Sequence, residues 1–439
     1  MTLIQLFQFI LSISILVILH ELGHFLPAKW FKCKVEKFYL FFDPGFSILK
    51  KKIGETEYGI GWLPLGGYVK IAGMVDESMD KEQLALPPQP WEFRSKPAWQ
   101  RLIIMLGGVT INFLLAWTIY GSLSYFNGET SFDTTKIKAP MNYSASAKAM
   151  GFKDGDKIIA VDGKSQTDLD KLSLDILLSD KITVLRSGQN FTFNTNDDGK
   201  ALALAEENPR GFLSPRQPAI VDTIINPKAS ASGLRVNDQF ISFNNEKIEF
   251  YDQLQNNISK NAGKNVNAEV LRNGRPIQLI LPVSKDGTLG IASYKFLQNF
   301  VETKHFTIPQ AVGRGFNRSI ESLTYQVKQF KLIFNKKVQG YKKVSGPIGI
   351  IKMMPTKFDW VRFWSFTAMF SVWLAFLNLI PIPGLDGGHV VFTLWEMITG
   401  KPVPQKVLEN AQMIGVIFLI ALMALIFGSD IVKWITGKF

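Results

Sequence analysis

Two histidines and a glutamate stand together near the start of the chain, in the pentad His20-Glu21-Leu22-Gly23-His24. The histidines are four residues apart, so on a helix their imidazoles project from one face, one turn apart. This spacing lets both rings reach a single Zn²⁺ at about 2.0–2.1 Å. Glu21 lies on the adjoining face, where a carboxylate can take a proton from water activated by the metal. The pentad therefore predicts a zinc site with Glu21 as its base.

A catalytic zinc site needs a third protein ligand and an open position. A second chemically rich segment, NLIPIPGLDGGH at residues 378–389, can supply that ligand. Its prolines end a helix, and its glycines allow tight turns, so we expect Asp386 to sit on irregular backbone at membrane depth. His389, three residues on, is the competing ligand. Spacing alone leaves both open, as well as a plain loop that ends a helix at the membrane surface.

The pentad lies within one long apolar run, and the second segment begins at the end of another. The runs cover residues 3–26, 102–126, 361–380 and 411–427. About 20 apolar residues are enough to cross a bilayer as a helix. A soluble core helix can be equally apolar, but four such runs in one chain favour four transmembrane helices. A cleaved signal peptide is the alternative for the first run, but no basic residue precedes it and no small-x-small cleavage site follows, so we expect a retained span.

The formal net charge of +12 over 439 residues admits two explanations. One is nucleic-acid binding; the other is a membrane protein whose flanking lysines face anionic lipid. The lysines border apolar runs, which favours lipid and no nucleic acid. Residues 27–52 hold seven lysines, whereas residues 126–135 hold no basic residue. The positive-inside rule then places residues 27–100 in the cytoplasm, and the N-terminus and the large middle segment outside it.

Two further patterns concern the segments between the spans. Residues 57–69, EYGIGWLPLGGYV, alternate apolar and small residues and contain Gly66 and Gly67. They predict a membrane-associated β-hairpin that offers a free edge strand near the first span. Residues 309–340 predict an amphipathic helix with a basic face, which lies on the membrane surface, braces the modules of the middle segment or serves as a plain connector.

The polar middle of the chain contains an internal repeat. Residues 144–163 and 228–246 both run through small residues, a glycine, an apolar residue, an aspartate and an apolar pair to a turn. Each is followed by a short helical stretch and by a strand-turn-strand pattern. The repeat predicts two small α+β modules within residues 129–300.

Together, HELGH and NLIPIPGLDGG resemble the site-2 protease family of intramembrane zinc metalloproteases. The family pattern NxxPxPxLDG is present as Asn378, Pro381, Pro383, Leu385, Asp386 and Gly387. The resemblance implies that His20, His24 and Asp386 bind Zn²⁺, in place of His389, and that Glu21 is the general base. We expect supporting or substrate-binding roles for Asn378, Pro381, Pro383, Gly66 and Gly67.

The paired modules are similar to bacterial PDZ domains, and two of them between the second and third spans resemble the regulator-of-sigma-E group of Gram-negative bacteria. Residues 67–74, GYVKIAGM, and 345–350, SGPIGI, are also typical of that group. The pair Asn237-Asp238 departs from the Gly-Asp that is usual in a PDZ module. The resemblance implies substrates such as trimmed single-span anti-sigma factors and remnant signal peptides, in envelope-stress signalling at the bacterial inner membrane. The PDZ modules would be periplasmic, and would exclude bulky substrates or bind peptide C-termini.

The expected fold is a multi-pass α-helical membrane protein with four transmembrane helices, a membrane-associated β-hairpin near 57–70 and two inserted PDZ-like α+β domains. The expected divisions are residues 1–126, 127–215, 216–300, 301–355 and 356–439, of which 301–355 form the helical connector. Two other classes of protein share some of these features. A membrane-anchored scaffold explains the modules but not the paired metal motifs. A transporter predicts inverted repeats, which the sequence does not show.

Overall fold

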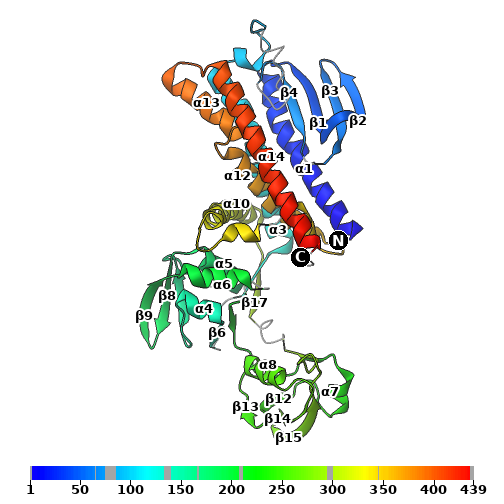
Figure 1. Cartoon of the computed structure of the whole chain (residues 1–439), viewed down its shortest axis with the longest axis vertical. Helices are drawn as coiled ribbons and strands as arrows, with labels where there is room; N and C mark the ends of the chain where they lie inside the picture. The colour runs from blue at the N-terminus through cyan, green and yellow to red at the C-terminus, as the bar shows by residue number, and fades with distance from the viewer. Residues whose placement is uncertain are drawn as a thin grey trace. The chain divides into compact units, whose positions relative to one another are not determined.

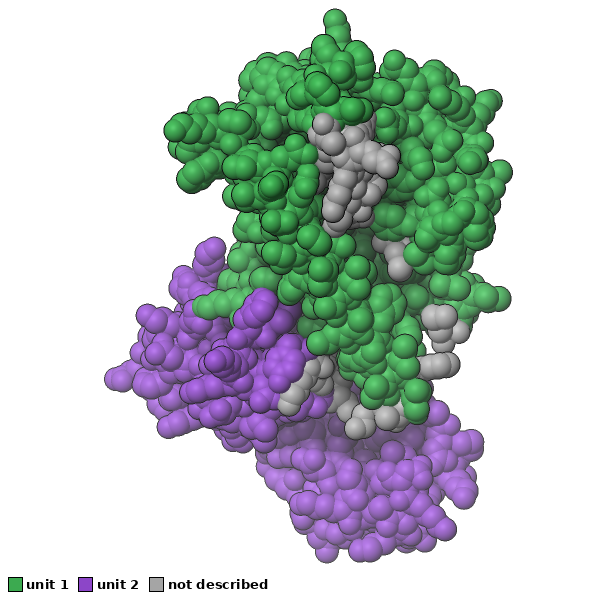
Figure 2. All heavy atoms as spheres, turned by 45° about the horizontal axis from the view of Figure 1, so that its top comes forward, with its two compact units in different colours: residues 1–128, 305–331, 343–439 green, residues 129–304, 332–342 purple. Residues whose placement is uncertain are grey.

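The computed structural model describes residues 2–64, 66–74, 86–132, 140–165, 168–206, 211–293, 300–344 and 346–435. The chain forms two compact units (Figure 2). The first unit comprises Met1–Gly128, His305–Lys331 and Lys343–Phe439. The second comprises Glu129–Lys304 and Leu332–Lys342. The pentad and the second motif both belong to the first unit.

Within the described residues, four helices are long and apolar enough to cross a membrane (Figure 1). They are α1 (Leu3–Trp30), α3 (Ala98–Asn127), α12 (Trp360–Leu379) and α14 (Gln405–Ile435). Helix α1 begins at the N-cap Thr2, whose side chain accepts a hydrogen bond from the Gln5 backbone, and continues past Pro27. Helix α12 ends two residues before Pro381, as expected where a proline cannot continue the helix. The four predicted spans are confirmed.

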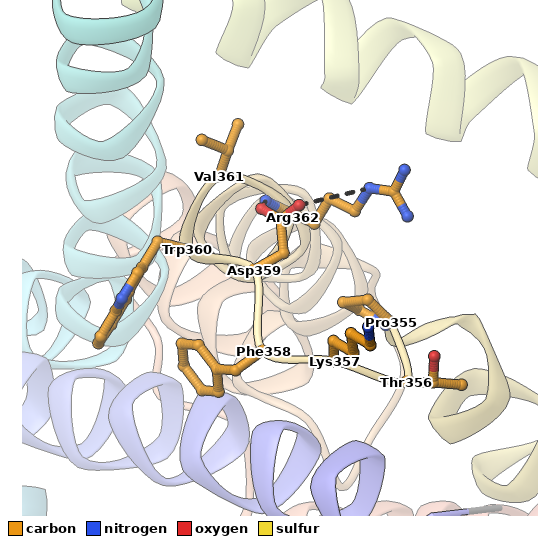
Figure 3. A pocket seen from close by; sticks show the side chains of 8 residues that line it. All are labelled: Pro355, Thr356, Lys357, Phe358, Asp359, Trp360, Val361 and Arg362. Atoms are coloured by element: carbon orange, nitrogen blue, oxygen red, sulfur yellow. Dashed lines mark hydrogen bonds and ion pairs between the residues drawn. The ribbon is translucent and has the colours of Figure 1, made fainter.

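Polar side chains inside this bundle bond to neighbouring segments. The amide of Gln5 donates to the Met354 carbonyl at 2.8 Å, and the amide of Gln8 donates to the Pro355 carbonyl at 2.9 Å. One helical turn deeper, the Ser12 hydroxyl bonds to a threonine hydroxyl on α12 at 2.8 Å. Buried polar groups in lipid need such partners. Residues 355–362 line an open pocket at the start of α12, shown in Figure 3.

A four-stranded sheet packs beside α1 (Figure 1). Its strands are β1 (Val35–Leu40), β2 (Phe42–Ile53), β3 (Thr56–Leu63) and β4 (Tyr68–Ile71), in the order β2-β3-β1-β4. Strand β1 runs parallel to β3 and antiparallel to β4. Strand β4 therefore lies at one edge of the sheet, with β1 as its one partner among the described strands.

The predicted hairpin over residues 57–70 is wrong in its pairing. Strands β3 and β4 lie in that range, but both pair with β1 and not with each other. The true hairpin joins β2 to β3 through a two-residue turn, in which Gly54 has a left-handed backbone with φ of +61°. The sequence did not reveal this because the pairing of β1 with β3 is parallel and non-local. Leu65, within the connection to β4, lies outside the described residues.

Among the described residues, three more α-helices lie wholly or mostly in the first unit: α10 (Ile308–Ile333), α11 (Pro347–Met353) and α13 (Asp386–Thr399). Helix α10 corresponds to the predicted amphipathic helix but ends at Ile333, earlier than expected. Its Gly315 lies against the backbone of Gly121 on α3, and the indole of Trp117 donates to the Val312 carbonyl at 2.8 Å. Helix α10 therefore packs on α3 through a close backbone contact.

The second unit contains two similar α+β halves, each with its own buried apolar core. Strand β5 (Glu129–Phe132) pairs with β17 (Val301–Lys304) where the chain enters and leaves the unit.

Among the described residues, the elements of the first half are β6 (Met141–Tyr143), α4 (Ala145–Met150), β7 (Lys157–Val161), α5 (Leu169–Leu178), β8 (Lys181–Arg186), β9 (Gln189–Asn194), α6 (Asp197–Ala205) and β10 (Leu213–Pro215). Those of the second half are β11 (Thr223–Ile224), α7 (Pro227–Ala231), β12 (Gln239–Phe243), β13 (Glu246–Lys247), α8 (Tyr251–Lys260), β14 (Asn265–Arg272), β15 (Arg275–Pro282) and β16 (Ile291–Ala292). The first half includes a three-stranded sheet in the order β7-β8-β9, and the second a four-stranded sheet in the order β13-β12-β14-β15.

The same buried ion pair recurs in both halves. Arg186, at the end of β8, donates through two nitrogens to the Asp156 carboxylate at 2.7 Å. Arg272, at the end of β14, does the same to Asp238, again at 2.7 Å. This equivalence supports the internal repeat. It also explains the unusual Asn237, because its φ of +69° matches the left-handed backbone of the glycine that precedes Asp156, and asparagine tolerates that conformation better than most residues.

Candidate metal centre

Three predicted ligands from two helices, α1 and α13, converge in the first unit. His20 Nε2 lies 3.4 Å from His24 Nε2. Asp386 Oδ2 lies 3.4 Å from His20 Nε2 and 3.2 Å from His24 Nε2. The two histidines are buried, and Asp386 Oδ2 is buried and accepts no hydrogen bond from the described residues. The three atoms thus form a nearly equilateral triangle.

The size of this triangle fits zinc. Ligand distances of about 2.0–2.1 Å in a tetrahedron require ligand atoms about 3.3–3.4 Å apart. Two imidazole nitrogens and one carboxylate oxygen leave the fourth corner open, as in catalytic sites. A buried carboxylate oxygen without a hydrogen-bond donor, facing two ring nitrogens, also calls for a cation. Among the described residues, His20, His24 and Asp386 form the cluster with metal-binding geometry, and His389 is not part of it.

Glycines bring α1 and α3 close enough to place the two histidines. A Cβ on Gly23 would overlap the backbone of Gly107, and a Cβ on Gly108 would overlap the His20 and His24 rings. The helices therefore touch backbone to backbone at the height of the pentad. The imidazoles fill space that any side chain at position 108 would occupy.

Helix α3 also contacts the outer nitrogen of each ring. His24 Nδ1 lies 2.8 Å from the Ile104 carbonyl oxygen. A carbonyl only accepts, so Nδ1 carries the proton and Nε2 keeps its lone pair in the neutral ring. His20 Nδ1 lies 3.1 Å from the side-chain amide of Asn112, which is fully buried on α3.

The third ligand begins a helix that the sequence analysis did not predict. Asp386 is the first residue of α13, so the expectation that it lies on irregular backbone is wrong; the irregular segment is the one just before it. A Cβ on Gly387 would overlap the Leu379 and Ile380 carbonyls. The glycine therefore lets α13 start directly against the end of α12.

The two prolines act on this turn from outside the metal cluster. The segment that contains Pro381 follows the end of α12 at Leu379. The Pro383 carbonyl lies against Gly415 of α14, where a Cβ would overlap it, and the Gly384 backbone donates to Gln412 of α14 at 3.2 Å. Both prolines therefore lie in the segment that joins α12 to Asp386, and a supporting role for them stays a prediction.

Asn378, in the last turn of α12, reaches the ligand atoms. Its amide lies 3.2 Å from His20 Nε2. The structure therefore brings this residue to the metal cluster, whereas its position in the sequence indicated only that it stands near Asp386.

Glu21 lies on the side of α1 that faces the sheet. It is buried, and the backbone of Val69 on β4 interacts with its carboxyl group. A Cβ on Gly67 would lie 3.5 Å from Glu21 Cγ and 2.6 Å from Val17 Cγ1. Gly67 therefore allows β4 to approach the glutamate closely. A Cβ on Gly66 would lie 2.9 Å from the ring of Phe42, and Glu21 is not among its nearest neighbours.

Sequence reasoning missed the contribution of α3. Asn112 is a polar residue within an apolar run, and that alone was a usable signal, because polar groups in spanning helices are costly and usually serve a purpose. The adjacent pair Gly107-Gly108 in the same run was a second signal of close helix packing.

Comparisons with known proteins agree with this geometry. Residues 8–422 match peptidase family M50. The chain is 30% identical to the regulator of sigma-E protease RseP of Escherichia coli over 453 residues, which cover 96% of this chain and 97% of that protein. It is 31% identical over 457 residues to a Vibrio cholerae protein whose name classes it with zinc metalloproteases, covering 97% and 98% of the two chains. It is 27% identical to the regulator of sigma E protease of Haemophilus influenzae over 451 residues, covering 97% and 98%.

The match spans nearly the whole chain, so it includes both motifs, the four apolar helices and the inserted unit. The chain therefore belongs to peptidase family M50, the site-2 proteases, and is a membrane-embedded zinc metalloprotease.

Proposed function

We propose that this protein is an intramembrane zinc endopeptidase of the bacterial inner membrane. It cleaves single-span membrane proteins within or near their transmembrane segments. The observation that supports this most is the triangle of two imidazole nitrogens and one carboxylate oxygen, 3.2–3.4 Å apart, buried among apolar helices. Ionisable groups at such depth are costly unless they serve a function.

In this proposal His20, His24 and Asp386 hold the metal. Bound Zn²⁺ supplies a reactive water near neutral pH and polarises the substrate carbonyl. Glu21, beside His20, takes the proton of the attacking water and later gives it to the leaving amine. Asn378 has an amide 3.2 Å from His20 Nε2, which is close enough to orient the substrate backbone at the same site.

The edge strand β4 presents the substrate. A helix in lipid satisfies its own backbone hydrogen bonds, so its peptide bonds must be uncoiled before they can be attacked. Strand addition to a sheet edge holds a peptide extended. Strand β4 has a free edge within the described sheet, and Gly67 and Val69 bring it to the catalytic glutamate.

The two halves of the second unit act as PDZ domains, over residues 127–215 and 216–300. They select substrates by excluding bulky, untrimmed proteins or by binding newly formed C-termini. Two relatives carry the name regulator of sigma-E protease, which supports anti-sigma factors, already shortened outside the membrane, as substrates in envelope-stress signalling. Remnant signal peptides share the single apolar span.

The proposed orientation places the N-terminus and the PDZ domains in the periplasm. Seven lysines in residues 27–52 follow the first span, and residues 126–135 after the second span hold no basic residue. Short cytoplasmic segments carry such an excess of lysine.

Cleavage of a single-span substrate by the purified full-length chain tests this function. Glu21→Gln keeps the size of the side chain but removes the base, so the rate should fall by about 10²–10⁴-fold while the bound zinc stays. Glu55→Gln is the matched control, because Glu55 is exposed and makes only a long surface ion pair with Lys29 at 3.9 Å. Unchanged cleavage by Glu21→Gln would refute the assignment of the base.

A further inference from the structure

If both histidines bind one metal through Nε2, then Nδ1 of each ring should carry the proton. For His24 this is settled, since Nδ1 must donate to the Ile104 carbonyl at 2.8 Å. Its Nε2 lone pair then faces Asp386. For His20 to present Nε2 in the same way, its Nδ1 must also carry the proton, and that proton needs an acceptor in a buried place.

The neighbour of His20 Nδ1 is the Asn112 side chain. Its amide nitrogen faces the ring at 3.1 Å, while its oxygen Oδ1 is buried and accepts no hydrogen bond from any residue that the structure describes. With an amide NH₂ as donor, Nδ1 would be the acceptor and the His20 proton would move to Nε2. That proton would point into the cluster and lack an acceptor among the described residues. Asp386 Oδ2 accepts no hydrogen bond from His20, and the Asn378 amide nitrogen, 3.2 Å from His20 Nε2, is itself a donor.

The two ends of an asparagine amide have nearly the same shape, and their identity is decided by their partners. We propose that Asn112 is a positioning residue of the metal centre: its Oδ1 accepts a hydrogen bond from His20 Nδ1–H and fixes the tautomer whose Nε2 faces Asp386. The proposal rests on the proposed ligand role of His20.

The backbone of α3 is built to hold this partner in place. Ile104, Gly108 and Asn112 are four residues apart and lie on one face of α3. Along this face the Ile104 carbonyl meets His24, Gly108 leaves room for both rings, and Asn112 meets His20. The backbone carbonyl of Asn112 in turn accepts a hydrogen bond from the Ser371 hydroxyl of α12 at 2.7 Å. Helix α3 thus provides one oxygen for each ring, and α12 anchors the residue that provides the second.

Zinc affinity of three full-length variants, measured by competition with a chelator in detergent, tests the role. Asn112→Leu removes the acceptor and should weaken zinc binding by about 10–100-fold, the usual effect of losing a partner of a metal-bound histidine. Asn112→Asp can only accept, so it should bind zinc within about threefold of wild type. Ser12→Ala is the control: Ser12 is also fully buried and bonds between helices, but to Thr367 and to neither histidine, and its zinc affinity should not change.

The Asn112→Asp variant separates the two amide orientations. If the Asn112 amide donated to His20, a carboxylate at this position could not replace it, and Asn112→Asp would be as weak as Asn112→Leu. That result, or wild-type affinity in Asn112→Leu, would overturn the proposal. Failure of the wild-type chain to bind zinc would instead overturn the proposed ligands, so the two failures are distinguishable.

A second measurement does not depend on zinc. In the metal-free chain with ¹⁵N-labelled histidine, at a pH where the rings are neutral, the nitrogen shifts of His20 should report a protonated Nδ1 in wild type and a shift toward protonated Nε2 in Asn112→Leu. A His20 ring already protonated at Nε2 in wild type would contradict the proposal.

Discussion

At the scale of single residues, the central question is which side chains hold the metal. Residue types and spacing predicted a zinc site at His20 and His24 and left Asp386 and His389 as alternatives for the third ligand. The structure places Asp386 Oδ2 within 3.2–3.4 Å of both ring nitrogens and leaves His389 outside the cluster found among the described residues. Position in the sequence could not decide between two residues that are three positions apart. The choice depends on where α13 begins, and its start places Asp386, not His389, beside the histidines.

The first prediction follows from this geometry. Asp386→Ala removes one of the three corners, so the zinc content of the purified chain should fall from about one per molecule toward zero. His389→Ala should keep the wild-type content. Elemental analysis of both variants after the same purification checks this. Zinc retained in Asp386→Ala and lost in His389→Ala would move the ligand role to His389.

At the scale of elements, the site depends on how closely α1 and α3 approach. The four apolar helices could be predicted from the sequence, since length and hydropathy are local properties. The contact between Gly23 and Gly107, and the sheet order that places β4 beside Glu21, could not, because each joins segments far apart in the chain. The wrong hairpin has the same origin: β3 and β4 are neighbours in sequence, yet β1 lies between them.

The close helix contact gives the second prediction. In Gly108→Ala the added methyl group would overlap the rings of both histidines, and relief of such overpacking costs about 1–3 kcal/mol. We expect zinc affinity to fall by about 10–100-fold, which corresponds to most of that range. Gly428→Ala is the matched control on α14, since nothing lies within 4 Å of its Cβ position. Chelator competition measures both variants, and equal affinity would mean that α3 does not set the ring positions.

The third prediction concerns the ion pair at the end of β8. Burial raises the pKa of the Asp156 carboxyl group, but the hydrogen bonds from Arg186 and from the Lys153 backbone, together with the positive charges of these two residues, outweigh burial and hold the pKa below its usual value of 3.8. A lowered pKa stabilises the fold above pH 3.8, and the stabilisation is lost as the pH falls through the folded-state value. The protection of backbone amides in residues 145–194 against hydrogen exchange, relative to their intrinsic exchange rates at the same pH, should therefore fall at the most acidic pH values.

Two variants check the cause of this pH dependence. Asp156→Asn should accelerate exchange in residues 145–194 already at neutral pH, because it leaves a largely buried arginine without its counter-charge, at a cost of about 3 kcal/mol. Asp154→Asn should not, because the exposed pair of Asp154 with Lys148 contributes little. The account of the ion pair fails if the two variants exchange alike.

At the scale of the whole molecule, the chain combines a membrane-embedded metal centre with an inserted unit of two similar halves. The repeat was visible in the sequence because Asp156 and Asp238 recur in the same local pattern, and the structure adds their arginine partners. The role proposed for the inserted unit is substrate selection, and it can be tested by removing the unit.

The fourth prediction tests the unit as a filter. Phe132 and Val301 are paired across β5 and β17, so residues 133–300 can be replaced by a short Gly-Ser linker without separating the ends. The shortened chain should cleave an untrimmed single-span substrate that the full chain spares, with zinc content as the control for an intact metal centre. If the unit binds new C-termini instead, cleavage of the trimmed substrate should fall. Unchanged cleavage of both substrates would exclude both roles.

The most direct test of the whole account is the position of the metal in the full-length chain, located by anomalous diffraction at the zinc absorption edge. We predict one peak about 2.0–2.1 Å from His20 Nε2, His24 Nε2 and an Asp386 carboxylate oxygen. A zinc peak on other residues, or none in a chain that cleaves its substrate, would contradict it.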